Sequence, residues 1–201
     1  MMDERTFWQT YRPTTPRQQA AAQVLQELAL FTTLAPYDPL LIGTVPLDVD
    51  TCQSDLDVAC HAPDLDTLGH VLVRAYGPYP DFELVRKRVR GVASAIGRFT
   101  WGGFAIEVFG QPLPVWAQYG VRHFLVEARL LALGGDPLRQ AVRALKEAGI
   151  RTEPAFAQLL GLQGDPYERL WTLSFASTET LAHLLAQAGW AILGPPALSG
   201  G

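Results

Sequence analysis

Residues 54–60, Ser-Asp-Leu-Asp-Val-Ala-Cys, constrain the fold of this chain most, because two acidic residues lead directly into an apolar run. The run Val-Ala-Cys predicts a buried β-strand. Side chains alternate between the faces of a strand, so Asp55 and Asp57 point the same way, about 6–7 Å apart. Because a carboxylate is costly to bury among apolar groups, the pair predicts a polar site on one face of a sheet.

Length and charge narrow the class of protein. The chain has 201 residues and 22.0 kDa, and 48% of its residues are hydrophobic, which is enough for one core with a helical subdomain. A formal net charge of −4 does not favour nucleic acid or an anionic membrane as partner. The two cysteines, the lack of a signal-peptide pattern and the lack of a 20-residue apolar run predict a cytoplasmic protein without a membrane partner.

The residue pattern changes along the chain from mixed to helical. Thr15, Pro16 and Gln18 predict a capped helix that runs toward Pro36. Further elements are predicted as a short strand over 39–42, a helix from 64 to 76, antiparallel strands within 82–108 with a turn at 102–103, and helices from 114 to 189 with a break at 134–137. We therefore expect an α+β core over 1–113, a helical subdomain over 114–193 and a frayed tail over 194–201.

A third acidic residue, Glu107, lies in the apolar strand predicted over 104–109. A divalent cation shared with Asp55 and Asp57 would offset the cost of burying these charges, and carboxylate oxygens are the ligands that Mg²⁺ prefers. Gly43 and Thr44 supply backbone N–H groups and a hydroxyl, which hold phosphate oxygens at turns.

This combination resembles the nucleotidyltransferase superfamily with the polymerase-beta-like fold. The pattern of that superfamily is a hydrophobic residue, Gly, and Gly or Ser, then about ten residues, then Asp-x-Asp, with a third acidic residue on a later strand. The matching segments are 42–44, 54–57 and 105–108, and 41–47, 54–57, 106–111, 119–123 and 152–157 look like a bacterial family of unknown function in that superfamily. The close resemblance covers most of residues 25–175, and Thr44 departs from the usual Gly or Ser.

The resemblance implies a mixed or antiparallel sheet flanked by helices, and a magnesium- or manganese-dependent enzyme. Asp55, Asp57 and Glu107 would be its catalytic and metal-binding residues. A nucleoside triphosphate would be held by the residues at the remaining matched positions, Gly43, Thr44, Ser54 and Arg122. The reaction would transfer a nucleoside monophosphate to an acceptor and release pyrophosphate, and we favour a small-molecule acceptor over a polynucleotide.

Several alternatives stay open at this point. The second Asp-x-Asp, at 48–50, is interpreted as solvated. In the alternative to a metal site, Asp55 and Asp57 cap the next turn, and Glu107 faces solvent on an antiparallel strand. Arg122 either contacts the triphosphate or joins a surface ion-pair network, and the helical spacing predicts a pair between His123 and Glu127. The competing class of function is a nucleotide-binding or regulatory protein without turnover, including a toxin–antitoxin component.

Overall fold

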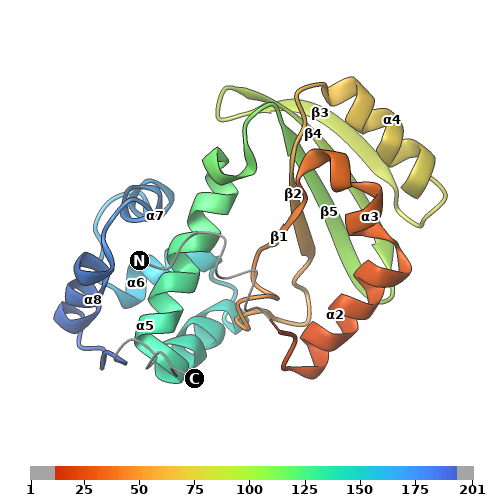
Figure 1. Ribbon diagram of the computed structural model, residues 1–201. Coiled ribbons are helices and arrows are strands. Elements are labelled where there is room, and N and C mark those ends of the chain that lie inside the picture. Colours follow the sequence, from red (N-terminus) through yellow and green to blue (C-terminus); the bar gives the residue numbers. More distant parts are fainter. Residues whose placement is uncertain (1–11, 194–201) are drawn as a thin grey trace, which may run out of the picture.

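The strands form a five-stranded sheet in the order β1-β2-β5-β4-β3 in the computed structural model, which describes residues 12–193 (Figure 1). β2 and β5 are parallel, and the other neighbours are antiparallel. The strands are β1 (Leu40–Ile42), β2 (Leu56–His61), β3 (Glu83–Val89), β4 (Val92–Trp101) and β5 (Phe104–Gln111). The predicted strand over 39–42 and the antiparallel strands within 82–108 are thus confirmed.

One face of the sheet packs against three N-terminal helices, α2 (Pro16–Glu27), α3 (Leu30–Thr33) and α4 (Leu65–Tyr76). Figure 1 shows α2, α3 and α4 together on this side of the sheet. Leu56, Val58 and Cys60 of β2 and Ile106 and Val108 of β5 point into this core. Because side chains alternate, Asp57 and Glu107 are directed to the opposite face.

The helical part of the chain lies beyond that opposite face. It comprises α5 (Tyr119–Glu147), α6 (Thr152–Leu159), α7 (Pro166–Leu173) and α8 (Thr178–Gln187), preceded by a short 3-10 helix η2 (Val115–Ala117). These helices share a second apolar core, which also includes Leu40 of β1 and Ala59 of β2. The helices therefore pack on one another and reach the sheet at β1 and β2 (Figure 1).

The first helix is capped as predicted but is shorter than predicted. The Thr15 hydroxyl accepts from the Gln18 backbone N–H, and the Gln18 side chain completes a capping box. The expectation of one continuous helix toward Pro36 is wrong. Ala29 has φ of 46°, in the left-handed region that interrupts a right-handed helix, and α3 and a 3-10 helix η1 (Ala35–Tyr37) follow.

The predicted break at 134–137 is present inside α5, where Gly135 has non-helical φ and ψ of 62° and −157°. Ser177 caps α8 as a hydroxyl acceptor for Thr180 N–H. Arg151 occupies the cap position of α6, and the Thr152 hydroxyl accepts from Lys146 Nζ. The predicted tail over 194–201 lies outside the described residues.

Within residues 12–193, no helix has the length and apolar character needed to cross a lipid bilayer.

Candidate functional site

A cleft of about 1180 Å³ separates the free face of the sheet from the C-terminal helices. Two groups of polar residues line it. We call Gly43, Thr44, Ser54, Asp55, Asp57 and Glu107 the sheet wall, and we call His123, Glu127, Lys146 and Glu153 the helical wall. Five of the six sheet-wall residues come from β1, β2 or the loop between them, and Glu107 comes from β5. Strand pairing therefore brings the sequence-predicted residues together, with the exception of Arg122.

Asp57 and Glu107 are direct neighbours across the parallel pair β2–β5. Both side chains are half-buried, and both lie on the cleft face of the sheet. Asp55 immediately precedes β2 and is exposed to the cleft. The spacing of the Asp-x-Asp motif thus places two carboxylates at one end of β2, with a third on the adjacent strand.

Burial, followed by the negative charges of Asp55 and Glu107, raises the pKa of Asp57 from its ordinary value of 3.8 to about 8. Lys146, from the helical wall, partly opposes this shift. A carboxyl group in such a position is stabilised in its charged form by a cation placed beside it. The sheet wall is therefore electrostatically suited to a divalent cation.

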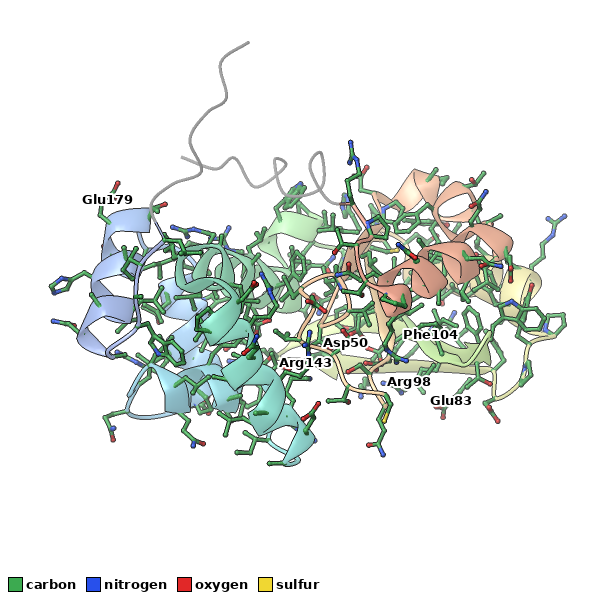
Figure 2. All side chains as sticks on the ribbon, turned by 90° about the horizontal axis from the view of Figure 1, so that it is seen from below. Asp50, Glu83, Arg98, Phe104, Arg143 and Glu179 are labelled. Atoms are coloured by element: carbon green, nitrogen blue, oxygen red, sulfur yellow. The ribbon has the colours of Figure 1, made fainter. Side chains whose placement is uncertain are left out.

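Glu107 has a protein partner of its own. Its carboxylate accepts from Arg98 Nε at 2.8 Å and forms an ion pair with Arg98 Nη2 at 2.5 Å, across the antiparallel pair β4–β5. Arg98 also lies 3.9 Å from Glu83, and Figure 2 shows these two labelled side chains on neighbouring strands. Among residues 12–193, no three or more His, Cys, Asp or Glu side chains are arranged so that together they could hold a metal ion.

Gly43 follows β1 and lies against the Asp57 carboxylate. A Cβ added to Gly43 would be 2.4 Å from Asp57 Oδ2, and φ at this position is 82°. Both the close approach and the left-handed backbone require glycine. The sequence interpretation of Gly43 as a site of close backbone approach agrees with this geometry.

The loop between β1 and β2 is closed by hydrogen bonds from its own hydroxyl groups. Thr44 Oγ1 lies 3.1 Å from Ser54 Oγ, and Ser54 Oγ accepts from the Thr51 backbone N–H at 3.0 Å. Ser54 therefore joins the two ends of the loop, which fixes Thr44 beside the start of Asp55-Leu56-Asp57.

Arginines from two helices hold the same loop from outside. Arg17 of α2 pairs with Asp50 at 2.8 Å and donates to Ser54 O at 2.9 Å. Arg143 of α5 pairs with Asp48 Oδ1 at 2.7 Å, and Figure 2 shows Arg143 and Asp50 where the sheet meets the helices. The interpretation of Asp48 and Asp50 as solvated is wrong. Asp50 is only 7% exposed, and both acids anchor the loop that carries the sheet wall.

Arg122 does not line the cleft. It is buried in α5, donates to Ser174 Oγ at 3.1 Å and to Ser174 O at 2.7 Å, and its guanidinium lies 4.3 Å from the centre of the Phe175 ring. These contacts join α5 to the end of α7. The structure therefore separates Arg122 from the other residues that the sequence assigns to the triphosphate.

His123 lies on the helical wall, and its partner differs from the predicted one. Nδ1 lies 3.0 Å from Glu153 Oε1 and Nε2 lies 2.9 Å from Tyr167 O, so the expected pair with Glu127 is wrong. Both ring nitrogens of His123 thus face oxygen acceptors, one from α6 and one from α7. The hydrogen bond from His123 lowers the pKa of Glu153 against the effect of its burial.

Lys146 and Glu127 are cleft residues that sequence reasoning missed. Lys146 is half-buried, and burial lowers its pKa, while the charges of Glu127, Glu153, Asp50 and Asp55 oppose that shift. Glu127 is 4% exposed, and burial raises its pKa well above the ordinary value. In the sequence these residues are marked only as polar positions within the apolar pattern of α5. Because the helix is broken at Gly135, that pattern does not show that both side chains face the cleft.

The tip of the β3–β4 hairpin reaches across the mouth of the cleft. Arg90, whose φ is 50°, lies 3.8 Å above the Tyr119 ring and forms an ion pair with Glu168. Tyr119 also stacks on Trp171, with ring centres 4.8 Å apart. The contacts of Arg90 therefore connect the β3–β4 hairpin to α5 and α7, in addition to the apolar packing between the sheet and the helices.

The donor chemistry of the sheet wall fits a hard divalent cation. Its ligating atoms are carboxylate and hydroxyl oxygens, which Mg²⁺ and Mn²⁺ prefer. Asp57 is buried beside two other acids, so a cation next to it would lower its raised pKa. Asp55 and Asp57 are therefore the residues that would hold such an ion, with Glu107 adjacent to them.

Comparison with solved structures shows the fold. The structure of the GLD-2–GLD-3 complex, a non-canonical poly(A) polymerase, matches with a TM-score of 0.54 and 12% identity over 98% of this chain and 71% of that chain. The GLD-2/RNP-8 complex matches with a TM-score of 0.51 and 12% identity over 93% and 71%. The Cid1 poly(U) polymerase with MgGTP bound matches with a TM-score of 0.50 and 12% identity.

The match to Cid1 covers 83% of this chain and 53% of that one, so the present chain spans about half of the Cid1 chain. At 12% identity these likenesses concern the fold, and they confirm the predicted α+β nucleotidyltransferase-like architecture. No curated protein matches the sequence. The family model described as a domain of unknown function, DUF4269, matches residues 23–173, and the chain belongs to that family.

Proposed function

We propose that this protein is a magnesium- or manganese-dependent nucleotidyltransferase that transfers a nucleoside monophosphate from a nucleoside triphosphate to a small acceptor. The observation that carries the proposal is the position of Asp57. It lies on the cleft face of a nucleotidyltransferase-like sheet, between the charges of Asp55 and Glu107 and against the backbone of Gly43.

Each residue of the sheet wall has a role in this proposal. Asp55 and Asp57 hold the cation, which when bound neutralises charge on the triphosphate and on the departing pyrophosphate. The backbone at Gly43 and the hydroxyl of Thr44 hold phosphate oxygens. Ser54 keeps Thr44 in place through their hydrogen bond.

Glu107 has two alternative roles in the proposal, and both use its Oε1 atom, because the contacts from Arg98 are to Oε2. It either completes the metal site beside Asp57 or accepts the proton of the attacking acceptor hydroxyl. Electrostatic stabilisation by prepositioned groups is the largest contribution in reactions of this type.

Lys146 extends the phosphate site across the cleft. It is the cationic side chain of the helical wall that acts on both Asp55 and Asp57 electrostatically. A lysine in this position neutralises the distal phosphates of a nucleotide bound to the sheet wall. In this proposal residues 1–113 supply the catalytic wall and residues 114–193 supply the opposite one.

Pyrophosphate release tests this function. The wild-type protein is incubated with Mg²⁺ or Mn²⁺, each of the four nucleoside triphosphates and a panel of small hydroxylated and aminated acceptors. We expect release with at least one pair, and a loss of about a hundredfold or more in the Asp55→Ala, Asp57→Ala double variant. The matched control is Asp66→Ala, on the exposed side of α4. Equal release by the double variant and the control would remove the sheet wall from the reaction.

One observation favours a second candidate function, nucleotide binding without turnover. The ion pair with Arg98 offsets the charge of the third carboxylate, so Glu107 attracts a cation less strongly. Under this alternative, Mn²⁺ and triphosphate bind but no acceptor yields product. The variant Arg98→Gln separates the two candidates. If the ion pair blocks turnover, this variant binds Mn²⁺ several-fold more tightly and gains activity, whereas an enzyme that needs Arg98 to orient Glu107 loses activity.

A further inference from the structure

Glu127 is a buried carboxyl group at the cleft for which the proposed phosphate site has no use. Its side chain lines the cleft and is 4% exposed. No hydrogen bond or ion pair to Glu127 is made by any residue from 12 to 193. Its carboxyl oxygens are not among the fully buried unpaired atoms of residues 12–193, so they open toward the cleft, where a ligand that enters would stabilise the group.

The groups that face Glu127 already have partners. Glu153 of α6 is bonded to His123, and Lys146 donates to the Thr152 hydroxyl at 3.0 Å. Burial and then the negative charge of Glu153 raise the pKa of Glu127, and Lys146 lowers it. The helical wall thus combines one lysine with two glutamates, and its deepest acid lacks a counter-ion of its own.

The cleft is large enough for a second ligand beside a nucleotide. Small-ligand sites commonly occupy about 300–1,000 Å³, and this cleft measures about 1180 Å³. Acids outnumber bases along its lining. The carboxyl groups are those of Asp55, Asp57, Glu107, Glu127, Glu153 and Glu168, and the lysine and arginine groups are those of Arg90, Lys146 and Arg151.

A bound triphosphate with its cations would neutralise the negative charge of the sheet wall. It would not neutralise the acids of the helical wall opposite. An anionic acceptor is repelled by those acids, whereas an ammonium group is attracted. Glu168 is paired with Arg90 and Glu153 with His123, which leaves Glu127 as the acid available to a ligand on the helical wall. These charges select a cationic ligand.

We propose that the helical wall binds the ammonium group of an aminated small molecule, with Glu127 as its counter-ion. This molecule is the acceptor of the transfer reaction, an assignment that rests on the proposed function. Binding is coupled to a proton. Burial raises the pKa of the Glu127 carboxyl in the empty cleft, and an ammonium ion beside it lowers that pKa, so binding releases protons to the solvent.

Calorimetric titration with putrescine tests the amine site without nucleotide. We expect binding to the wild-type protein with release of protons, measured across a pH series in two buffers that differ in ionisation enthalpy. 1,4-Butanediol, which replaces both amines with hydroxyls, should not bind. Glu127→Gln should weaken putrescine binding by about tenfold or more and abolish the proton release. Glu147→Gln, an exposed glutamate on the same helix, is the matched control and should leave both unchanged.

Two further arms keep the test decisive. Glu127→Asp retains the charge and should retain the proton release. This variant can be measured if Glu127→Gln does not fold. Unchanged putrescine binding in Glu127→Gln, or the absence of binding to the wild-type protein at millimolar concentration, would overturn the proposal. Selective loss of Mn²⁺–ATP and Mn²⁺–CTP binding in Glu127→Gln, with Mn²⁺–UTP retained, would assign Glu127 to a nucleobase amino group and overturn it as well.

The amine site and the proposed function fail separately. Asp55→Asn should remove Mn²⁺–triphosphate binding and leave the putrescine titration unchanged. If the wild-type protein binds putrescine but no triphosphate, the proposed function fails and the amine site stands. If it binds triphosphate but not putrescine, the opposite holds.

Discussion

The two walls of the cleft are built by different means. The sheet wall is set by backbone hydrogen bonds, because Asp57 and Glu107 lie opposite each other in a parallel ladder and Gly43 touches Asp57 at the end of β1. The helical wall is set by side-chain bonds between helices, such as those from His123 to Glu153 and to Tyr167 O. Backbone pairing fixes neighbours in space, whereas side-chain bonds depend on how separate helices pack.

Their electrostatics differ as well. On the sheet wall, burial and then the charges of Asp55 and Glu107 raise the pKa of Asp57, and a cation beside the carboxylate would lower it again. On the helical wall, burial and then the charge of one acid, Glu153, raise the pKa of Glu127, and Lys146 lies among these acids and lowers it. This difference underlies the two proposals, in which the sheet wall holds metal and phosphate and the helical wall binds the second ligand.

The strongest way to break this comparison is Asp57→Asn. Removal of the charge from the centre of the sheet wall should reduce turnover by about a hundredfold or more and eliminate Mn²⁺ binding, because the cation loses a ligand. Pyrophosphate release and a Mn²⁺ titration measure the two effects. Putrescine binding at the helical wall should be unaffected, and its loss would show that the walls do not act separately.

Gly43→Ala tests whether the backbone of β1 belongs to the site. The added Cβ would lie 2.4 Å from Asp57 Oδ2, so the carboxylate must move, and Mn²⁺–ATP affinity should fall by about tenfold. Gly103→Ala is the matched control, because φ is +80° there and nothing lies within 4 Å. Both variants should lose about 1–2 kcal/mol of stability from the left-handed backbone. An equal loss of affinity in both would contradict the assigned contact.

The pH dependence sharpens the electrostatic difference. The folded protein holds the Asp57 proton to a pKa of about 8, whereas the unfolded chain releases it near 3.8. Between these values the folded state binds more protons, so the stability contributed by Asp57 falls as pH rises toward about 8 in metal-free protein.

Mn²⁺ affinity should rise over the upper part of this range, because the ion displaces that proton. Thermal melting and Mn²⁺ titration at about pH 6, 7 and 8 measure the two trends. The variant Asp57→Asn should flatten the pH dependence of melting. A metal affinity that does not depend on pH would contradict the raised pKa.

Arg122→Gln is expected to have the smallest effect on ligands. The substitution breaks the bonds to Ser174 and should cost about 1–3 kcal/mol of stability, measured by urea unfolding. Mn²⁺–ATP affinity should stay within about twofold of the wild type, because Arg122 lies outside the cleft lining. A tenfold loss of affinity would restore the sequence-based assignment of Arg122 to the triphosphate.

The sheet wall was predictable because its signals are local. The alternation around Asp57, the glycine at the end of a short strand and the acid within an apolar strand each follow from strand geometry. The ion pair that occupies Glu107 was not predictable, because it requires the register of β4 against β5. The left-handed backbone at Ala29 was missed because nothing in the helical pattern marks it.

The helical wall was not predictable for a physical reason. Glu127 and Lys146 are separated by nineteen residues, with the kink at Gly135 between them, so helical periodicity does not relate their directions. Asp48 and Asp50 were interpreted as solvated because the arginines that bind them come from distant helices, α2 and α5. Contacts between residues far apart in sequence decide both cases.

Anomalous diffraction from crystals grown with Mn²⁺ and a non-hydrolysable triphosphate tests the central claim most directly. The account predicts a manganese peak bound by the carboxylates of Asp55 and Asp57, with the phosphates beside Gly43 and Thr44. A manganese peak held by Glu127 and Glu153, or triphosphate bound with no manganese at Asp57, would contradict it.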